Sequence, residues 1–262
     1  MTIDDKMRHD AACALREAEV SVRPMEPLSR THPGLEPADA YDIQLRNITH
    51  RLGNGARLVG HKVGLTSAAM QELLGVDEPD FGHLLDDMVI EQGGTVETSR
   101  YCRPRVEPEI CFRLARGLRG PEVTREDVLV ATDSVAPALE IVDSRIRNWE
   151  ITLVDTIADN ASSAGLVHGP WLPLEKLPDL AEVPVELFVD DDPVATGTGA
   201  AVLGHPAEAV AWLANTLWRF GTALEPGQMI LPGAMTTAPF VNAGQRIDAR
   251  FDVLGPVSVS FN

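Results

Sequence analysis

The stretch RVEPEI, residues 105–110, places two acids, Glu107 and Glu109, on either side of a proline within an apolar, strand-like run. In an extended strand, alternate side chains share a face, so both carboxylates point the same way from backbone positions about 7 Å apart. Two unpaired carboxylates this close repel each other and resist burial. A hard divalent cation such as Mg²⁺ or Mn²⁺ removes the conflict, because such ions prefer carboxylate oxygens. A solvated acidic strand face is the alternative.

A third acid favours the metal site over the solvated face. Glu140 lies in the middle of SVAPALEIVDSRI, residues 134–146, a second apolar and strand-like run. An unpartnered carboxylate there would be costly to bury. Three acids in two core-like strands therefore predict one divalent-metal site, formed by Glu107, Glu109 and Glu140.

The sequence pattern changes at Arg57, where short β-rich runs separated by Gly, Pro and Asp begin. Strands are expected at residues 57–65, 105–114, 135–143, 183–190, 228–234, 246–254 and 257–261. Helices are expected at residues 6–20, 36–52, 68–74 and 206–220. Strands outnumber helices and do not alternate regularly with them, which favours a β-rich mixed α+β fold over a doubly wound parallel sheet. We expect a helical N-terminal cap region over residues 1–56 and a β-rich catalytic domain over residues 57–262.

The composition excludes several classes of function. Asp and Glu outnumber Lys and Arg by 39 to 22, for a formal charge of −17, which argues against nucleic acid and anionic membranes as partners. Cys13, Cys102 and Cys111 lack metal-type spacing and are expected to be reduced thiols. The N-terminus has no apolar signal segment, and no run approaches about 18 apolar residues. We therefore expect a cytoplasmic protein.

A lysine in GHKVGLTS, residues 60–67, is the next candidate. The chain has lysine at only three positions, Lys6, Lys62 and Lys176, so Lys62 between glycines in a strand-to-loop segment is unusual. A compact ammonium can hold a carboxylate or enolate oxygen. A surface lysine on a turn is the alternative.

Two polar segments carry further candidates. GVDEPDFGHLLDDM, residues 75–88, is expected to be a loop broken by Pro and Gly, with acids at Asp77, Asp80, Asp86 and Asp87. DTIADNASSAG, residues 155–165, is either a helix cap and turn or a polar loop whose Ser162 or Asn160 could hydrogen-bond a substrate carboxylate. Most acids in such loops are merely solvated, so neither segment identifies a site by itself.

Taken together, these motifs resemble a known family. GHKVGLTS, GVDEPDFGHLLDDM, PRVEPEI, PALEIVDSRI, DTIADNAS and LGHPAEAVAWLAN occur in the order seen in the hydratase/decarboxylase branch of the fumarylacetoacetate hydrolase superfamily. The resemblance runs from about Ala40 to the C-terminus, and six ordered motifs are far more specific than any one of them. Members of this branch act on 2-hydroxydienoic and 2-oxo acids in meta-cleavage degradation of aromatic compounds or steroids.

The resemblance implies roles for individual residues. The metal ligands correspond to Glu107, Glu109 and Glu140, with Mg²⁺ or Mn²⁺ as the expected cofactor. Lys62 and Asp80 correspond to a catalytic lysine and aspartate, whereas Ser162 and Asp155 correspond to positions that contact substrate. The resemblance also implies a β-rich mixed roll with a helical N-terminal part, and a homo-oligomer that can associate with a related decarboxylase or hydratase.

The resemblance favours a hydratase that adds water to a 2-hydroxy-2,4-dienoate, giving a 4-hydroxy-2-oxo acid. The alternative within the branch is a 4-oxalocrotonate decarboxylase, because chelation of a 2-oxo acid by a metal serves both reactions. SRIRNWEITLVDTIADNASS and GHLLDDM look more like the hydratases. The usual histidine of the hydrolase branch has no clear counterpart, which disfavours carbon–carbon hydrolysis. A non-catalytic, metal-stabilised binding protein is the alternative of another class.

Overall fold

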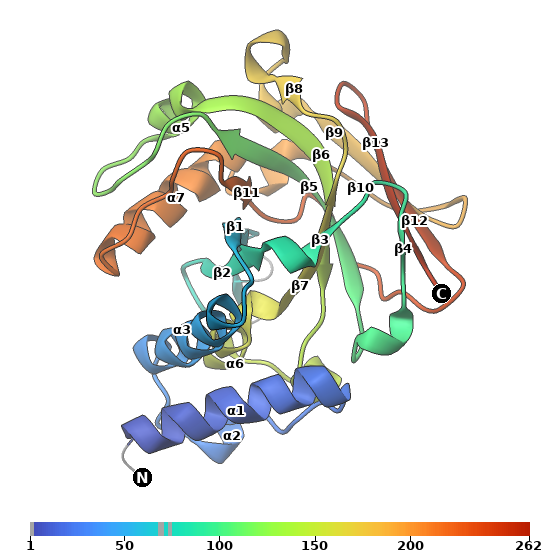
Figure 1. Ribbon diagram of the computed structural model, residues 1–262. Coiled ribbons are helices and arrows are strands. Elements are labelled where there is room, and N and C mark those ends of the chain that lie inside the picture. The colour runs from blue at the N-terminus through green and yellow to red at the C-terminus, as the bar shows by residue number, and fades with distance from the viewer. Residues whose placement is uncertain (1–2, 68–70, 73–74) are drawn as a thin grey trace.

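Two β-sheets run through the part of the chain that a computed structural model describes, residues 3–67, 71–72 and 75–262 (Figure 1). The strand order of the first is β2 (Asp80–Leu85), β1 (Leu58–Gly64), β11 (Met229–Leu231), β5 (Arg105–Leu114), β6 (Thr132–Val142), β7 (Ser163–His168) and β3 (Val89–Ile90), with β8 (Leu172–Pro173) paired to β6. The order of the second is β10 (Asp192–Thr198), β9 (Pro184–Val189), β12 (Arg246–Phe251), β13 (Gly255–Phe261) and β4 (Thr95–Val96).

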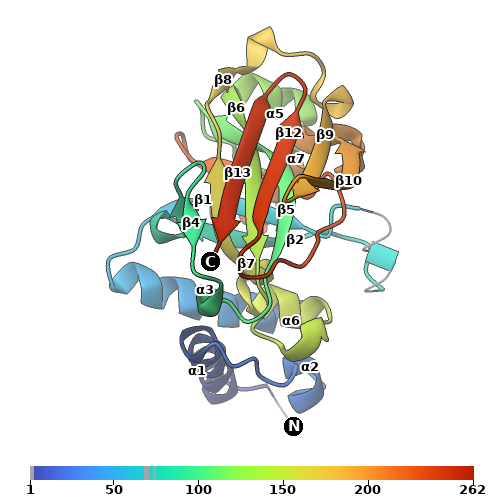
Figure 2. The same ribbon diagram turned by 90° about the vertical axis from the view of Figure 1, so that its right-hand side faces the viewer.

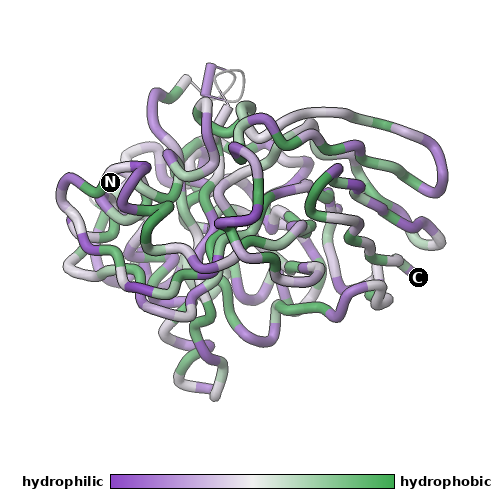
Figure 3. Tube along the Cα trace, turned by 90° about the horizontal axis from the view of Figure 1, so that it is seen from above, coloured by the Kyte–Doolittle hydropathy of each residue, from purple (hydrophilic) through white to green (hydrophobic). Residues whose placement is uncertain are grey.

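The second sheet packs across the first, and the main core lies between them. Strands β12 and β13 cross in front of β6 and β7 (Figure 2). Val257 and Val259 of β13 and Leu139 and Ile141 of β6 are fully buried in one hydrophobic cluster. Hydrophobic segments run through the middle of the molecule, and hydrophilic ones are prominent at the outer turns (Figure 3).

Within the described residues, six α-helices with assigned bounds form two groups outside the sheets. Four helices gather at one end of the molecule (Figure 1): α1 (Asp5–Ser21), α2 (Leu28–Thr31), α3 (Pro37–Gly53) and α6 (Leu153–Ala158). Two more, α5 (Arg125–Ala131) and α7 (Pro206–Arg219), pack against each other elsewhere.

Local sequence explains where α3 and α7 begin and where α7 ends. Helix α3 begins with Pro37 in its first turn, and the Asp39 carboxylate accepts a hydrogen bond from the Glu36 backbone N–H. Helix α7 likewise begins at Pro206, after a cap in which the His205 side chain accepts from a backbone N–H. Gly221, just past its end, has a φ of 77°, a conformation that glycine adopts without strain.

The expected mixed, β-rich α+β fold is confirmed, although α5, β7 and β10 were not expected and one segment was assigned wrongly. Residues 75–88 were expected to be a loop, but residues 80–85 form β2, which pairs antiparallel with β1. The helix expected over residues 68–74 falls largely outside the described residues. The division at residue 56 stays a prediction. None of the described helices is long and apolar enough to cross a membrane.

A buried ion pair joins the end of β6 to the corner between α6 and β7. The Arg145 Nε and the Asp159 Oδ1 are 2.6 Å apart, and the two side chains are 6% and 1% exposed. The Arg145 guanidinium also donates to the backbone carbonyls of Asp143 and Asp159. Burial raises the pKa of Asp159 to about 7, although Arg145 opposes the shift. The pair therefore holds the corner that carries residues 160–162.

We predict that Arg145→Met lowers the free energy of unfolding by about 3–5 kcal/mol, because Asp159 is left buried without a cation. The loss should be larger at pH 8 than at pH 5. An acid whose folded-state pKa is raised destabilises the fold increasingly as the pH rises above its unfolded value near 3.8. Urea denaturation at both pH values measures the effect. Arg246→Met, which breaks the more exposed pair with Asp248, is the control and should cost less than about 1 kcal/mol. Equal losses in the two variants would contradict the prediction.

Candidate metal centre and active site

The pairing of β5 with β6 brings the three predicted glutamates together. In the antiparallel register Glu107 lies directly opposite Glu140, and Glu109 shares their face because it is two residues further along β5. One carboxylate oxygen from each of the three lies within 4.8 Å of the other two. Glu109 and Glu140 are fully buried, whereas Glu107 is partly exposed. The cluster is therefore approached from the side of Glu107.

The hydrogen bonds of the cluster leave room for a cation. Glu109 Oε2 accepts from the Gly233 backbone N–H at 2.7 Å, and Glu140 Oε1 accepts from the Ser163 hydroxyl at 2.7 Å. Glu109 Oε1 is buried and has no hydrogen-bond partner among the described residues. A buried carboxylate oxygen that lacks a donor is costly, and oxygen-only ligands suit Mg²⁺ or Mn²⁺. The donor set fits a hard divalent cation.

The pKa values of all three glutamates are raised, mainly because burial disfavours their charged forms. Burial, and then the charges of Glu140 and Glu107, raise the pKa of Glu109 well above its ordinary value. Burial also raises the pKa of Glu140 to about 7, although the Lys62 charge opposes the shift. The pKa of Glu107 is raised mainly by burial as well. The positive charge of Lys62 therefore only partly offsets the cost of burying these carboxylates.

Lys62 supplies the positive charge beside Glu140. Its Nζ is 3.3 Å from Glu140 Oε2 and donates a hydrogen bond of 2.9 Å to the Ala161 carbonyl, and its side chain is 4% exposed. Burial acts to lower the pKa of Lys62, but the surrounding carboxylates outweigh it and raise the pKa above its ordinary value. Lys62 is therefore a buried side chain paired with Glu140 and not a residue of a surface turn.

Asp80 lies opposite Gly64 across the β1–β2 pair, and Lys62 is two residues before Gly64 on β1. Asp80 Oδ2 accepts a hydrogen bond of 3.1 Å from the Thr156 hydroxyl, while Oδ1 is buried without a partner among the described residues. Gly64 makes this arrangement possible, since a Cβ there would lie 2.2 Å from Asp80 Oδ1 and 3.3 Å from Lys62 Nζ. Burial raises the pKa of Asp80, and Lys62 and Thr156 oppose the shift. An acid with one free oxygen and a raised pKa is suited to proton transfer.

The turn before β7 presents polar groups to the same region. Asn160, Ala161 and Ser162 all have φ between 50° and 56°, a left-handed conformation that is strained for residues other than glycine. This turn directs the Ala161 carbonyl to Lys62, and it leaves the buried Ser162 hydroxyl without a partner among the described residues. The Asn160 side chain anchors the turn by exchanging hydrogen bonds with the His83 backbone N–H and carbonyl.

Both carboxylate oxygens of Asp155 accept hydrogen bonds from neighbouring residues of the fold. One oxygen accepts from the Ser29 backbone N–H, and the other accepts from the Ser29 hydroxyl and from the Thr152 N–H and hydroxyl. These bonds cap α6 and tie it to α2. The arrangement is that of a helix cap and an interhelical tie, so Asp155 is separated in role from the other predicted site residues.

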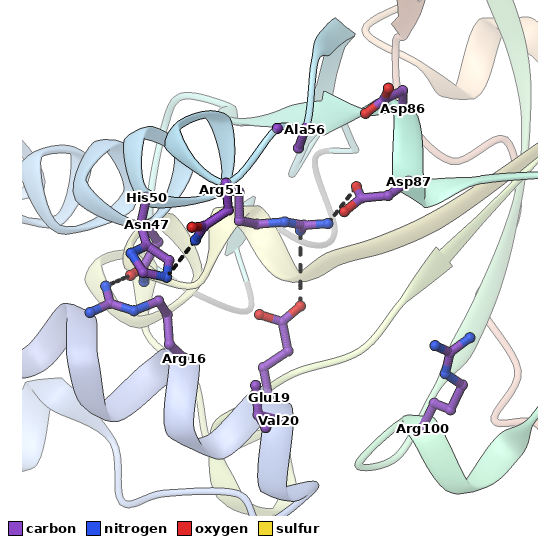
Figure 4. Close-up of a pocket in the computed structure, with 12 residues that line it drawn as sticks. Arg16, Glu19, Val20, Asn47, His50, Arg51, Ala56, Asp86, Asp87 and Arg100 are labelled. Carbon is purple, nitrogen blue, oxygen red and sulfur yellow. Dashed lines mark hydrogen bonds and ion pairs between the residues drawn. The ribbon is translucent and has the colours of Figure 1, made fainter.

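The other acids of residues 75–88 are not part of the cluster. Asp77 is exposed, and Asp86 and Asp87 are paired with Arg57 and Arg51. Asp86 and Asp87 line a separate pocket of about 700 Å³ between α1, α3 and the 3-10 turn Asp86–Met88. In Figure 4, Arg51 extends across this pocket between Glu19 and Asp87. Neither the three glutamates nor Lys62, Asp80, Asp155 and Ser162 line it.

Sequence reasoning missed several groups that support the site. Ser163, Thr156, the Gly233 N–H and the Ala161 carbonyl each hydrogen-bond one of the charged residues. Thr156 and Ser163 lie within or next to the DTIADNAS motif, so their position beside Ser162 was a usable signal. The backbone groups carry no sequence signal, because any residue type supplies them.

The chain is similar over nearly its whole length to several known proteins. The chain is 44% identical over 249 residues to the 2-hydroxyhexa-2,4-dienoate hydratase of Comamonas testosteroni, covering 94% of each chain. It is also 44% identical over 256 residues to the 2-keto-4-pentenoate hydratase of Paraburkholderia xenovorans, covering 98% of this chain and 95% of the relative. Among solved structures, the 4-oxalocrotonate decarboxylase of Pseudomonas putida G7, complexed with magnesium and adipate, superposes with a TM-score of 0.97 at 35% identity, covering 100% and 99% of the two chains.

The resemblance inferred from the six motifs is confirmed by a family match that covers most of the chain. Residues 54–261 match the fumarylacetoacetate (FAA) hydrolase C-terminal family, and the roll of two sheets with an N-terminal helical region is the fold of its structural relative. The chain belongs to the fumarylacetoacetate hydrolase family.

Proposed function

We propose that this protein is a metal-dependent hydratase that adds water to a 2-hydroxy-2,4-dienoate and releases a 4-hydroxy-2-oxo acid. The observation that carries the proposal is the cluster of three glutamates, Glu107, Glu109 and Glu140, beside the Lys62 ammonium. Nearby, the Asp80 carboxylate has one oxygen without a hydrogen-bond partner among the described residues. Full-length relatives at 44% identity that are named as hydratases of such dienoates support the same reaction.

A divalent cation held by the three glutamates would act as a Lewis acid toward the carboxylate and the 2-oxo oxygen of the substrate. Mg²⁺ or Mn²⁺ is the proposed ion, because every ligand is a carboxylate oxygen and because the structural relative is complexed with magnesium. Lys62 adds a fixed positive charge at the same place, so negative charge that develops on the substrate oxygen is stabilised without rearrangement of the protein.

Asp80 is the proposed proton carrier. The reaction first needs a proton at C5 of the dienol and loss of the proton from the 2-hydroxyl, which gives the 2-oxo-3-enoate. Water then adds across C3 and C4, with the hydroxyl at C4 and the proton at C3. Asp80 Oδ1 has no other hydrogen-bond partner among the described residues, and burial raises the pKa of Asp80, which strengthens this carboxylate as a proton acceptor. Ser162, with its free hydroxyl, is the proposed contact for a substrate oxygen.

A decarboxylase acting on 4-oxalocrotonate is the second candidate. It is favoured by the near-complete structural superposition on a protein of that name. The carboxylate cluster and Lys62 would serve either reaction, since both build negative charge on the 2-oxo oxygen. The higher identity to the hydratases, 44% against 35%, makes hydration the primary proposal.

The test is turnover of a substrate panel followed by ultraviolet absorbance, with products identified by mass spectrometry. With Mg²⁺ present, 2-hydroxypenta-2,4-dienoate should lose its dienol absorbance and gain the mass of one water. A chelator should stop the reaction, and added Mg²⁺ or Mn²⁺ should restore it. Loss of carbon dioxide from 4-oxalocrotonate without hydration of any dienoate would establish the decarboxylase instead. Absence of turnover with every substrate, despite metal binding, would indicate a non-catalytic binding protein.

We predict that Glu109→Gln weakens Mn²⁺ binding by more than about 100-fold, since loss of a direct ligand exceeds the usual effect of an outer partner. Isothermal titration calorimetry measures the affinity. The metal-free variant should be at least as stable as the wild type at pH 8, because one buried charge is removed from a repelling cluster. Glu186→Gln on the exposed face of β9 is the control and should bind Mn²⁺ normally. Undiminished Mn²⁺ affinity in Glu109→Gln would rule out the proposed ligand set.

We predict that Asp80→Asn lowers kcat by about 10²- to 10⁴-fold, the usual contribution of a positioned proton-transfer group. The KM and the Mn²⁺ affinity should change much less, because chelation does not involve this side chain. Exchange of substrate carbon-bound hydrogen with deuterated water should slow in parallel if ketonisation is the step that Asp80 serves. Asp77→Asn, an exposed acid three residues earlier, is the control. A variant that loses affinity while it retains its rate would show that Asp80 binds and does not transfer protons.

A further inference from the structure

We propose that Gln44, on α3, is a positioning residue that fixes the relative placement of Asp80 and Thr156. Its side chain is fully buried. The single amide nitrogen Nε2 donates to the Phe81 carbonyl at 3.0 Å and to the Ile157 carbonyl at 2.7 Å. The inference rests on the proposed function, because the group being positioned is the proposed proton carrier.

The two acceptors are the chain neighbours of the two groups that meet in the site. Phe81 follows Asp80 on β2, and Ile157 follows Thr156 on α6. The Thr156 hydroxyl donates to Asp80 Oδ2 at 3.1 Å, so the amide of Gln44 links the same two segments one residue away. The amide thus sets the separation of two backbones, and this separation sets the geometry of the Asp80 carboxyl group.

A second contact from α3 holds β2 in the same place. Tyr41 lies three residues before Gln44, and therefore on the same side of the helix. Its ring stacks on Phe81 with centroids 4.5 Å apart and an interplanar angle of 18°. Phe81 and Asp80 are adjacent in a strand, so their side chains point to opposite faces. Helix α3 therefore supports β2 from the face opposite the Asp80 side chain.

The chemistry of this position favours positioning over simple core filling. Gln44 Oε1 is buried and has no hydrogen-bond partner among the described residues. A buried acceptor without a partner destabilises a fold, and an apolar side chain of similar size would avoid that penalty. What only an amide or a similar donor supplies is the pair of hydrogen bonds to the two carbonyls. Loss of that pair would let β2 and α6 shift, and misplacement by about 1 Å can cost about 10²-fold in rate.

The experiment compares Gln44→Leu, which keeps the approximate size and removes both donors, with Asn215→Leu as a matched control. Asn215 on α7 makes a similar but only partly buried link, exchanging two hydrogen bonds with the Val123 backbone, and neither bond involves β2 or α6. We expect Gln44→Leu to lower kcat by about 10- to 100-fold, while KM and Mn²⁺ affinity change by less than about 3-fold. Asn215→Leu should lose stability and keep the wild-type kcat.

A double-mutant cycle distinguishes positioning from a general loss of structure. If Gln44 acts through Asp80, adding Gln44→Leu to Asp80→Asn should lower kcat little further, because the positioned group is already absent. A full, additive loss in the double variant, or a wild-type kcat in Gln44→Leu, would overturn the proposal. Gln44→Glu is the second variant should Gln44→Leu fail to fold. It keeps the shape but directs a carboxylate at two carbonyl oxygens, and it should give the same loss of kcat.

Failure of the proposed function gives a different result. If the wild-type protein turns over neither a dienoate nor 4-oxalocrotonate, the proposed function is wrong, and amide hydrogen exchange then tests the link itself. Faster exchange in Gln44→Leu confined to β2 and α6 would support the positioning role. The same exchange pattern in Gln44→Leu and Asn215→Leu, or unchanged exchange in β2 and α6, would overturn it.

Discussion

The repulsion among three neighbouring glutamates, two of them fully buried, is the constraint on which the site depends. Burial raises the pKa of each carboxyl, and one buried ammonium, Lys62, only partly compensates for them. Replacing such a cluster by apolar residues would normally favour stability. Its presence in the core is therefore best understood as a requirement of metal-assisted chemistry, because a divalent cation converts mutual repulsion into shared attraction.

The surrounding backbone is shaped by this requirement. The Lys62 ammonium needs an acceptor besides Glu140, and the left-handed turn at residues 160–162 supplies the Ala161 carbonyl. That turn fits against β2 only because residue 82 is glycine, since a Cβ there would lie 2.4 Å from the Asn160 carbonyl oxygen. Strain at a turn is retained only where the rest of the structure determines it. The strained turn and the close strand contact are therefore coupled features of one charged site.

The parts of the site that follow from local pattern could be predicted from the sequence, and the parts that depend on long-range pairing could not. The shared face of Glu107 and Glu109 is a consequence of strand periodicity, and Glu140 was recognisable as an acid in an apolar run. The spacing of Thr152 and Asp155 is also a local signal, that of a helix cap, which is one of the two alternatives that the sequence offered for residues 155–165. In contrast, Gln44 and Ile157 are 113 residues apart, and only the folded register brings them together.

The change from helical to β-rich sequence near residue 56 marks a change of secondary structure, and the contacts cross it. Gln44 and Tyr41 lie before that point and before the segment matched by the family, yet both contact Phe81 beside Asp80. The glutamates and Lys62, which would serve any reaction that builds charge on a 2-oxo oxygen, all lie after it. Proton handling, unlike charge stabilisation, must be specific to each reaction, because the proton has to reach a particular carbon. A fold that keeps its carboxylate cluster and varies the helices packed behind the proposed proton carrier can therefore change its reaction without rebuilding the proposed metal site.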